Sequence, residues 1–312
     1  MTRVREVDAD LWALALQAAE FVPLQQSPAY GTALARRGRE PRRLLVEDDG
    51  GRIACGVQAS TRRFAGLRLF TAALRGPVAF AGGRDAIAPG PLAASIRALR
   101  RPWPHALVVA PEIADGAEST EALRGCGLRR VMTPASSVEV ALAGDAASLR
   151  ARLSGKWRNR LAKAERSGLR VDIARGGASL SWLAGAHARA MKARGFRGLP
   201  ADFVMDLAAA SARRDVFLCV AEMKRQTVAA ALFLRHGPTA TYVAAAAEPD
   251  GRTVHAGTLL AWRGLLALQE AGATRADLGQ VDTERSAGLA RFKLGMGGEV
   301  FVPCGTWTPS PL

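Results

Sequence analysis

The chain has 312 residues and 49% hydrophobic residues, enough for two domains of ordinary size or one large domain with a substantial core. No window approaches the roughly 18 uncharged apolar residues of a membrane-spanning helix, and the first residues lack the apolar core of a signal peptide, so we expect a cytoplasmic location. The formal net charge of +15 predicts attraction to a polyanion or an anionic surface, although an arginine- and alanine-rich chain is also typical of a GC-rich genome.

The first half of the chain predicts two helices, an antiparallel meander, and then alternating helices and strands. Helices are expected at residues 11–20, 29–37, 92–99 and 119–124, and strands at 43–47, 53–60, 67–73, 106–110, 128–132 and 138–142. Gly and Pro residues punctuate these segments at the expected turns.

The second half repeats this order of elements. Helices are expected at residues 147–167, 181–192, 202–213, 256–271 and 282–292, and strands at 216–222, 227–235, 240–246, 275–278 and 300–303. No residue-level repeat links the halves, so a duplication is inferred from the order of elements alone. We therefore expect two lobes, residues 1–144 and 145–312, that meet near Gly144.

One cluster accounts for part of the positive charge. Residues 150–170 hold eight basic side chains and one acid, Glu165. In a helix that starts near Ser154, an apolar stripe runs through Trp157, flanked by the cations Lys156, Arg158, Arg160 and Lys163. A solvated helix face would carry interspersed glutamates, which are mostly missing here. The pattern therefore favours a face that binds phosphates, on a nucleotide-linked acceptor, a CoA or an RNA.

Other chemistries find little support in the sequence. The four cysteines are far apart and form no C-x-x-C pair, which predicts buried thiols rather than a disulfide or a zinc site. His105, His187 and His236 are isolated, and no G-x-S-x-G segment is present, so we expect neither a metal nor a covalent nucleophile. Direct attack by an acceptor amine on an activated ester or thioester fits better.

The stretch at residues 276–299 combines a strand end, an acidic turn, a helical segment with Phe292 and Lys293, and a glycine-rich exit. Amide formation passes through a tetrahedral oxyanion, and a fixed cation near that oxygen lowers the barrier by about 3 kcal/mol. Lys293 is our catalytic candidate, expected to be partly exposed before a flexible turn; alternatively it is a surface lysine at a helix end.

This stretch is similar to the C-terminal signature of the Fem family of aminoacyltransferases, in which a D-L-G-G-like strand end precedes G-L-x-x-F-K-x-G-F-G-G. Gln280 replaces a glycine of that pattern, and Met296 replaces an aromatic residue. Three segments resemble other family motifs in the same order: L-Q-Q-S-P-A-Y-G at residues 24–31, R-G-P at 75–77, and the basic helix from Leu153.

The resemblance implies an α/β (α+β) fold with two tandem GNAT-like acyltransferase lobes, each a mixed, mostly antiparallel sheet flanked by helices. It implies transition-state stabilisation by Lys293, with Phe292 as a packing or nucleotide-contacting partner. Asp277 and Asp282 are candidates to hold the acceptor amine, although Asp282 is equally well placed as a helix N-cap. Tyr242 would line the acyl pocket or simply pack.

In GNAT proteins, the segment equivalent to residues 249–258 holds the CoA pyrophosphate at a helix N-terminus. Arg252 and Gly257 fit that role. His255 and Ala256, however, stand where a glycine pair is expected. We therefore weigh a cofactor-binding role for His255 against that of a polar residue at the start of a helix, and favour the latter over any catalytic role.

These features predict a cytoplasmic acyltransferase that forms an amide, without a permanently bound cofactor or metal. By analogy with the family, the co-substrate is aminoacyl-tRNA and the acceptor a peptidoglycan precursor of the cell wall. An acyl-CoA-dependent N-acyltransferase that acts on a lipid, polysaccharide or small-metabolite amine is the main alternative. A catalytically silent RNA- or membrane-surface-binding protein of the same fold is a second one, and contact with the membrane surface is compatible with all three.

Overall fold

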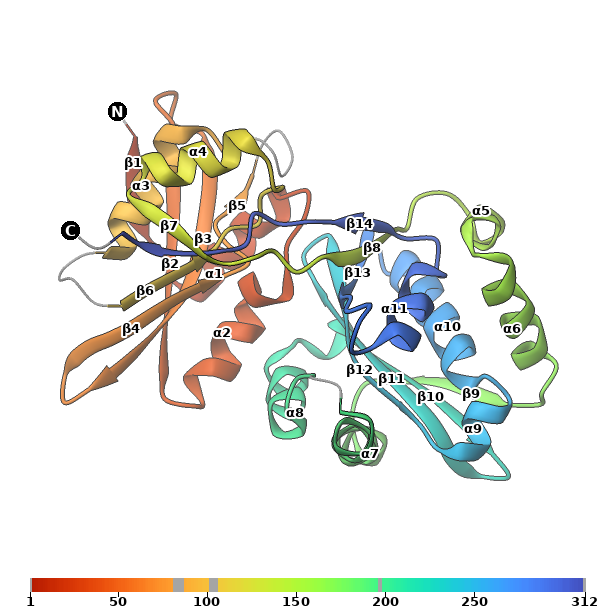
Figure 1. The fold of residues 1–312 in the computed structure, drawn as a ribbon. Helices are drawn as coiled ribbons and strands as arrows, with labels where there is room; N and C mark the ends of the chain where they lie inside the picture. The colour runs from red at the N-terminus through yellow and green to blue at the C-terminus, as the bar shows by residue number, and fades with distance from the viewer. Residues whose placement is uncertain (1, 81–86, 101–105, 196–197, 311–312) are drawn as a thin grey trace. The chain divides into compact units, whose positions relative to one another are not determined.

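The computed structural model describes residues 2–80, 87–100, 106–195 and 198–310. It divides into two compact units, Met1–Ser136 with Phe301–Leu312, and Ser137–Val300 (Figure 1). The division differs from lobes that meet near Gly144. The strand Ser137–Ala141 pairs within the second sheet, and the C-terminal segment from Phe301 returns to the first unit.

The first unit is built on a mixed sheet with the order β1-β2-β3-β4-β6-β15-β7, in which β5 also pairs with β3. The strands are β1 (Arg3–Glu6), β2 (Arg39–Glu47), β3 (Ile53–Phe64), β4 (Leu67–Leu74), β5 (Val78–Ala79), β6 (Ala106–Ala110), β7 (Leu128–Met132) and β15 (Thr306–Pro309). The helices are α1 (Ala9–Ala15), α2 (Pro28–Ala35), α3 (Pro89–Arg100) and α4 (Ala117–Gly125), with short 3₁₀ turns at Leu16–Ala18 and Leu24–Gln26. Buried Trp12 and Trp307 lie in two separate apolar clusters of this unit.

The L-Q-Q-S-P segment has a structural role. The Gln26 amide donates to the backbone oxygens of Gln58 and Leu74, at 3.0 and 2.8 Å, and its Oε1 accepts from the Gln58 N–H at 2.7 Å. The Trp12 indole donates to the Gln26 carbonyl at 2.8 Å. All these groups are buried or partly buried. Each bond therefore gives a partner to a polar atom that would destabilise the fold if it were buried without one. The segment thus connects α2 to β3 and β4.

The R-G-P segment is structural in the same way. Arg75 makes a bidentate ion pair with Glu112, at 2.8 and 2.7 Å, and the Glu112 side chain is 1% exposed. A Cβ at Gly76 would lie 2.5 Å from the amide nitrogen of Gln26, so glycine is needed for the close approach. The L-Q-Q-S-P and R-G-P segments therefore pack directly against each other.

The second unit contains a seven-stranded sheet with the order β14-β8-β13-β12-β11-β10-β9. The strands are β8 (Ser137–Ala141), β9 (Arg170–Ala174), β10 (Val216–Met223), β11 (Gln226–His236), β12 (Thr239–Ala247), β13 (Arg275–Gln280) and β14 (Glu299–Phe301). The helices are α5 (Ala146–Arg152), α6 (Gly155–Glu165), α7 (Ala178–Arg194), α8 (Ala201–Ala210), α9 (Pro249–Thr253), α10 (Ala256–Glu270) and α11 (Ala287–Leu294), with a 3₁₀ turn at Arg213–Asp215.

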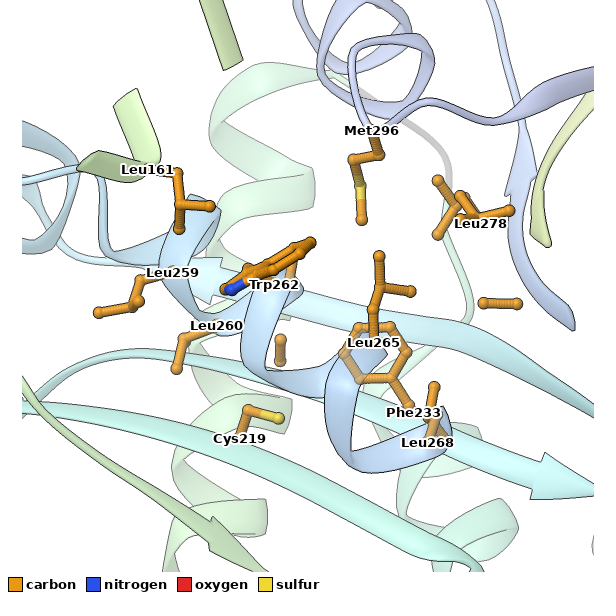
Figure 2. Packing of buried hydrophobic residues seen from close by; sticks show 14 of the residues in the cluster. Leu161, Cys219, Phe233, Leu259, Leu260, Trp262, Leu265, Leu268, Leu278 and Met296 are labelled. Carbon is orange, nitrogen blue, oxygen red and sulfur yellow. The ribbon is translucent and has the colours of Figure 1, made fainter. Parts of the chain in front are cut away.

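Helix α10 forms the centre of the second core. Figure 2 shows Trp262, Leu265 and Leu268 in one cluster with Cys219 and Phe233 of the sheet. A Cβ at Gly264 would collide with the Phe233 ring, so this glycine lets the helix lie close to the strands. Each buried side chain of this size contributes about 1.5–3 kcal/mol. The core therefore fixes the position of the α10 N-terminus.

The two sheets share one plan. In each, four strands pair in an antiparallel series, the fourth pairs in parallel with a fifth, and two further strands complete the edge. The sixth position is filled by β15 in the first sheet and by β8 in the second, and the first unit takes this strand from beyond the second unit in the chain. The expected tandem GNAT-like fold is confirmed.

The structure corrects two predicted helices. The helix expected at residues 147–167 is two helices, because Leu153 and Ser154 adopt extended backbone angles and bury the Leu153 side chain. Ser154 does precede α6 as the expected N-cap, although its hydroxyl makes no capping bond. The helix expected from Asp282 begins only at Ala287. Strands β1, β5, β9 and β15 are absent from the prediction.

Candidate active site

The candidate site lies where two parallel strands diverge. Cα partners of β12 and β13 extend only from Thr239 opposite Arg275 to Thr241 opposite Asp277. Both strands then continue without further pairing to each other in this fully described stretch. Val243 is an extra residue where β12 shifts register against β11, and such a bulge bends the strand. The divergence leaves backbone groups of both strands available to an extended ligand.

Lys293 reaches this region from the end of α11. Its Nζ donates to the Gln280 carbonyl at 2.7 Å, and the residue is only 7% exposed. Burial lowers the pKa of Lys293 to about 8, against the opposing effect of Asp277. The expectation of a partly exposed lysine is therefore wrong. A buried ammonium with three donors, one of them used by Gln280, can offer the others to a developing negative charge.

Asp277 is completely buried next to this lysine, and its Oδ1 accepts from the Gly279 N–H at 2.7 Å. The structure adds Glu139, which the sequence analysis did not single out. Glu139 is 2% exposed and lies directly opposite Asp277 in the antiparallel β8–β13 pair. Residues opposite each other in a sheet project to the same face. The signal in the sequence was a lone carboxylate inside an apolar strand, a type of residue rarely buried without a specific role.

The glycine-rich exit is closely packed, not a flexible turn. Gly297 has a φ of 76°, and a Cβ there would lie 2.6 Å from the Arg152 carbonyl oxygen. A Cβ at Gly298 would lie 2.6 Å from Val138, and the Gly295 carbonyl accepts from the Ser154 N–H at 3.0 Å. These contacts hold the end of α11 against the α5–α6 junction and β8.

The basic helix α6 buries the predicted stripe of Trp157, Leu161 and Ala164, and leaves all four candidate cations exposed. They do not share one role. Arg158 donates to the carbonyls of Ala151 and Leu153, at 3.0 and 2.9 Å, and so stabilises the end of α5. Lys156 makes no ion pair among the described residues.

Arg160 and Lys163 lie near the start of α10. The pKa of His255 is lowered by burial and then by Lys163 and Arg160, which places both cations close to the imidazole. His255 is the N-cap of α10 with a left-handed φ of 56°, and its carbonyl accepts from the N–H groups of Thr258 and Leu259. A Cβ at Gly257 would meet no atom within 4 Å. The structure therefore combines a helix N-terminus with two cations.

Four other candidates have local structural roles. Asp282 is exposed and accepts from the N–H groups of Glu284 and Arg285, which closes the turn before α11. Phe292 packs against Trp157 with ring centroids 5.9 Å apart. Arg252 donates to the Ala247 carbonyl at 2.6 Å. Tyr242 is half-buried, 5.0 Å from the Phe233 ring, and burial raises its pKa.

In the part of the chain that the structure describes, neither a group of metal ligands nor the cavity of the first unit belongs to this site. Among the described residues, no group of three or more His, Cys, Asp and Glu side chains is arranged to hold a metal. A cavity of about 510 Å³ lies in the first unit, between the starts of α3 and α4 and the loop after β6. Because that unit does not contain Lys293, the cavity is not part of the candidate site.

Known proteins share the domain and the fold of this chain. Residues 149–298 match a family model described as "Acetyltransferase (GNAT) domain". A crystal structure of FemX is similar to the whole chain, with a TM-score of 0.83, 14% identity, and coverage of 99% of this chain and 97% of that chain. No curated protein sequence matches the chain.

Two further solved structures share the fold. A tandem GNAT protein from the clavulanic acid biosynthesis pathway has a TM-score of 0.56 and 13% identity, with both chains covered completely. L-PGS from Bacillus licheniformis has a TM-score of 0.56 and 13% identity, with 98% of this chain and 92% of that chain covered.

The matched domain, residues 149–298, is that of a GNAT acyltransferase. Over the whole chain, the fold is similar to that of FemX and of the tandem GNAT protein. No helix in the described part of the chain is long and apolar enough to cross a membrane.

Proposed function

We propose that the chain transfers an activated acyl or aminoacyl group to an acceptor amine, with Lys293 as the catalytic cation. The amine nitrogen attacks the carbonyl carbon of an ester or thioester and forms the C–N bond. The carbonyl oxygen carries the negative charge of the tetrahedral intermediate. The C–O or C–S bond then breaks, and the proton lost by the amine ends on the leaving oxygen or sulfur.

The burial of Lys293 is the observation that supports this role. An ammonium that is 7% exposed acts through a medium of lower dielectric than water, so it stabilises an oxyanion more strongly than a surface lysine would. A pKa of about 8 leaves the side chain mostly protonated near pH 7. Buried Asp277 favours the protonated form, and we assign it and Glu139 to the support of the cation and the acceptor amine.

For the donor, we propose that the α10 N-terminus, His255, Gly257, Arg160 and Lys163 bind its phosphates. Both donor types carry phosphates, so this arrangement does not by itself select one. The similarity to FemX over nearly the whole chain supports aminoacyl-tRNA, with an amine of a cell-wall precursor as the acceptor. The acetyltransferase family match at residues 149–298 supports acyl-CoA as the second candidate donor.

A donor screen tests the proposal. Purified protein is incubated with total charged tRNA or with a panel of acyl-CoAs, in the presence of amine-bearing peptidoglycan precursors and small amines, and amide products are detected by mass spectrometry. We expect product from charged tRNA, and loss of product with Lys293→Met. Product from acyl-CoA alone would select the second candidate. Absence of product from either donor, or unchanged turnover in the variant, would refute the proposed chemistry.

A further inference from the structure

The hairpin between β3 and β4 carries an unusual set of exposed side chains. Pairing of β2 with β3 starts at Arg39 opposite Arg62, and pairing of β4 with β6 starts at Phe70. Residues 63–69 therefore extend past these pairings and pair with each other, with Phe64 opposite Leu67 (Figure 1). We call residues 62–69 the hairpin tip.

The hairpin tip exposes three large apolar side chains within six residues. Phe64 is 72% exposed, Leu67 is 69% exposed and Leu69 is 47% exposed. Single exposed apolar residues are common on protein surfaces and need no explanation, but a contiguous group is typical of an interaction surface. The turn between them, Ala65 and Gly66, adds no polar side chain.

Arginines surround this apolar group. Arg39 lies opposite Arg62, and Arg63 lies opposite Arg68, so two pairs of like charges face each other across the strands. Such pairs destabilise a sheet. Among the described residues, Glu40 pairs with this group, and its pKa is lowered chiefly by its hydrogen bond with Arg63. Glu40 offsets one of the four positive charges of Arg39, Arg62, Arg63 and Arg68. The surface around the apolar side chains therefore has a strong net positive charge.

We propose that the hairpin tip inserts into the surface of an anionic lipid bilayer. Phe64 and Leu67 would enter the boundary between head groups and acyl chains, while Arg62, Arg63 and Arg68 bind head-group phosphates. A bilayer surface satisfies both features at once, because it offers a dense layer of phosphates directly above an apolar phase. A convex hairpin turn fits a fluid surface. This inference does not depend on the donor or on the role of Lys293.

Vesicle co-sedimentation tests the inference with the full-length protein. The vesicles are made of phosphatidylcholine alone or of phosphatidylcholine mixed with phosphatidylglycerol. The double variant Phe64→Ser/Leu67→Ser keeps every charge, and we expect it to lower the partition coefficient on anionic vesicles at least about tenfold. The matched control is Leu14→Ser in α1, since Leu14 is also 69% exposed, and we expect no change.

A second variant tests the charges. Arg62→Gln/Arg68→Gln should weaken binding to anionic vesicles about 25-fold, and should leave the weak binding to neutral vesicles unchanged. None of the variants should melt below the wild type, because the replaced side chains lie at the end of the hairpin and removing one of two facing arginines relieves repulsion.

Three results would overturn the inference. The first is equal vesicle binding by the wild type and the serine variant, which would mean that overall charge alone attracts the protein. The second is a wild-type dimer in solution that the serine variant abolishes, which would assign the tip to a second copy. The third is binding to RNA that depends on Phe64 and Leu67 without binding to vesicles.

Discussion

Replacing Lys293 with methionine should remove most of the activity without destabilising the protein at pH 7. If the ammonium binds the oxyanion only in the transition state, kcat and kcat/KM should both fall by roughly 100-fold or more. Methionine keeps most of the side-chain volume, so the packing around α11 should survive. Lys293→Arg should restore little activity, because a planar fork cannot occupy the place of a compact charge.

The expected stability follows from the pKa of the buried lysine. A pKa of about 8 instead of 10.5 corresponds to about 3 kcal/mol of unfavourable free energy for burying the charge. The methionine variant avoids this cost but leaves the Gln280 carbonyl without its donor, a loss of about 1 kcal/mol. The net effect at pH 7 should therefore be a small gain in stability, with Tm raised by a few degrees.

The difference in stability between the wild type and the methionine variant should change with pH. The folded-state pKa of Lys293 lies below the unfolded one, so the unfolded chain binds the extra proton between about pH 8 and pH 10.5. Relative to the variant, the wild type should gain stability as the pH rises through that window. The difference in Tm between the variant and the wild type should be largest below pH 8 and should decrease towards pH 10.5.

Thermal unfolding of both proteins across this pH range measures the effect. Lys192→Met, at an exposed position of α7, serves as the control and should show no such convergence. A methionine variant that melts below the wild type at pH 7, or a Tm difference that is constant with pH, would show that Lys293 is retained for structure. Full turnover in the variant would remove it from the mechanism.

Three further predictions concern other parts of the second unit. Arg160→Glu/Lys163→Glu should weaken donor binding at least about tenfold, make the affinity less dependent on salt concentration and raise the pKa of His255. Unchanged donor affinity, together with an unchanged His255 titration by NMR, would show that these cations only face solvent. Arg158→Ala should lower the free energy of unfolding by about 1–2 kcal/mol without changing the KM for the donor, and a selective rise in KM would contradict its structural role. Gly297→Ala should cost about 2 kcal/mol or more, because φ is 76° and the added Cβ meets a carbonyl; an unchanged denaturation midpoint would refute the close packing.

The sequence was sufficient to predict most of the fold. In strands such as β10 and β11, apolar residues alternate with polar ones or follow each other without interruption between clear turn signals. Local patterns of this kind predict a strand directly from the sequence. Four short strands were missed: β1, β9 and β15 are partly polar, and β5 has only two residues. These strands form because a neighbouring strand supplies hydrogen-bond partners. A short stretch of sequence does not show which distant strand will pair with it.

The candidate site was predicted only in part. A chemical pattern drew attention to Lys293, but its burial depends on contacts between α11, β13 and the glycine-rich exit. The charges of Arg160 and Lys163 were visible in the sequence, whereas their position beside His255 depends on the packing of α6 against α10. Glu139 was overlooked because its neighbour Asp277 is far away in the chain and meets it only through strand pairing.

The sixth strand of the first sheet comes from the last residues of the chain, and this has a consequence for synthesis on the ribosome. Domains made from one continuous segment can complete their folding while the rest of the chain is still being translated. Here the unit that is made first lacks β15 until Thr306–Pro309 have been translated, whereas the second unit, Ser137–Val300, is complete in sequence before then. Until that point, a nascent chain has no strand between β6 and β7, and the part of the protein that is made first completes its sheet after the second unit has been made.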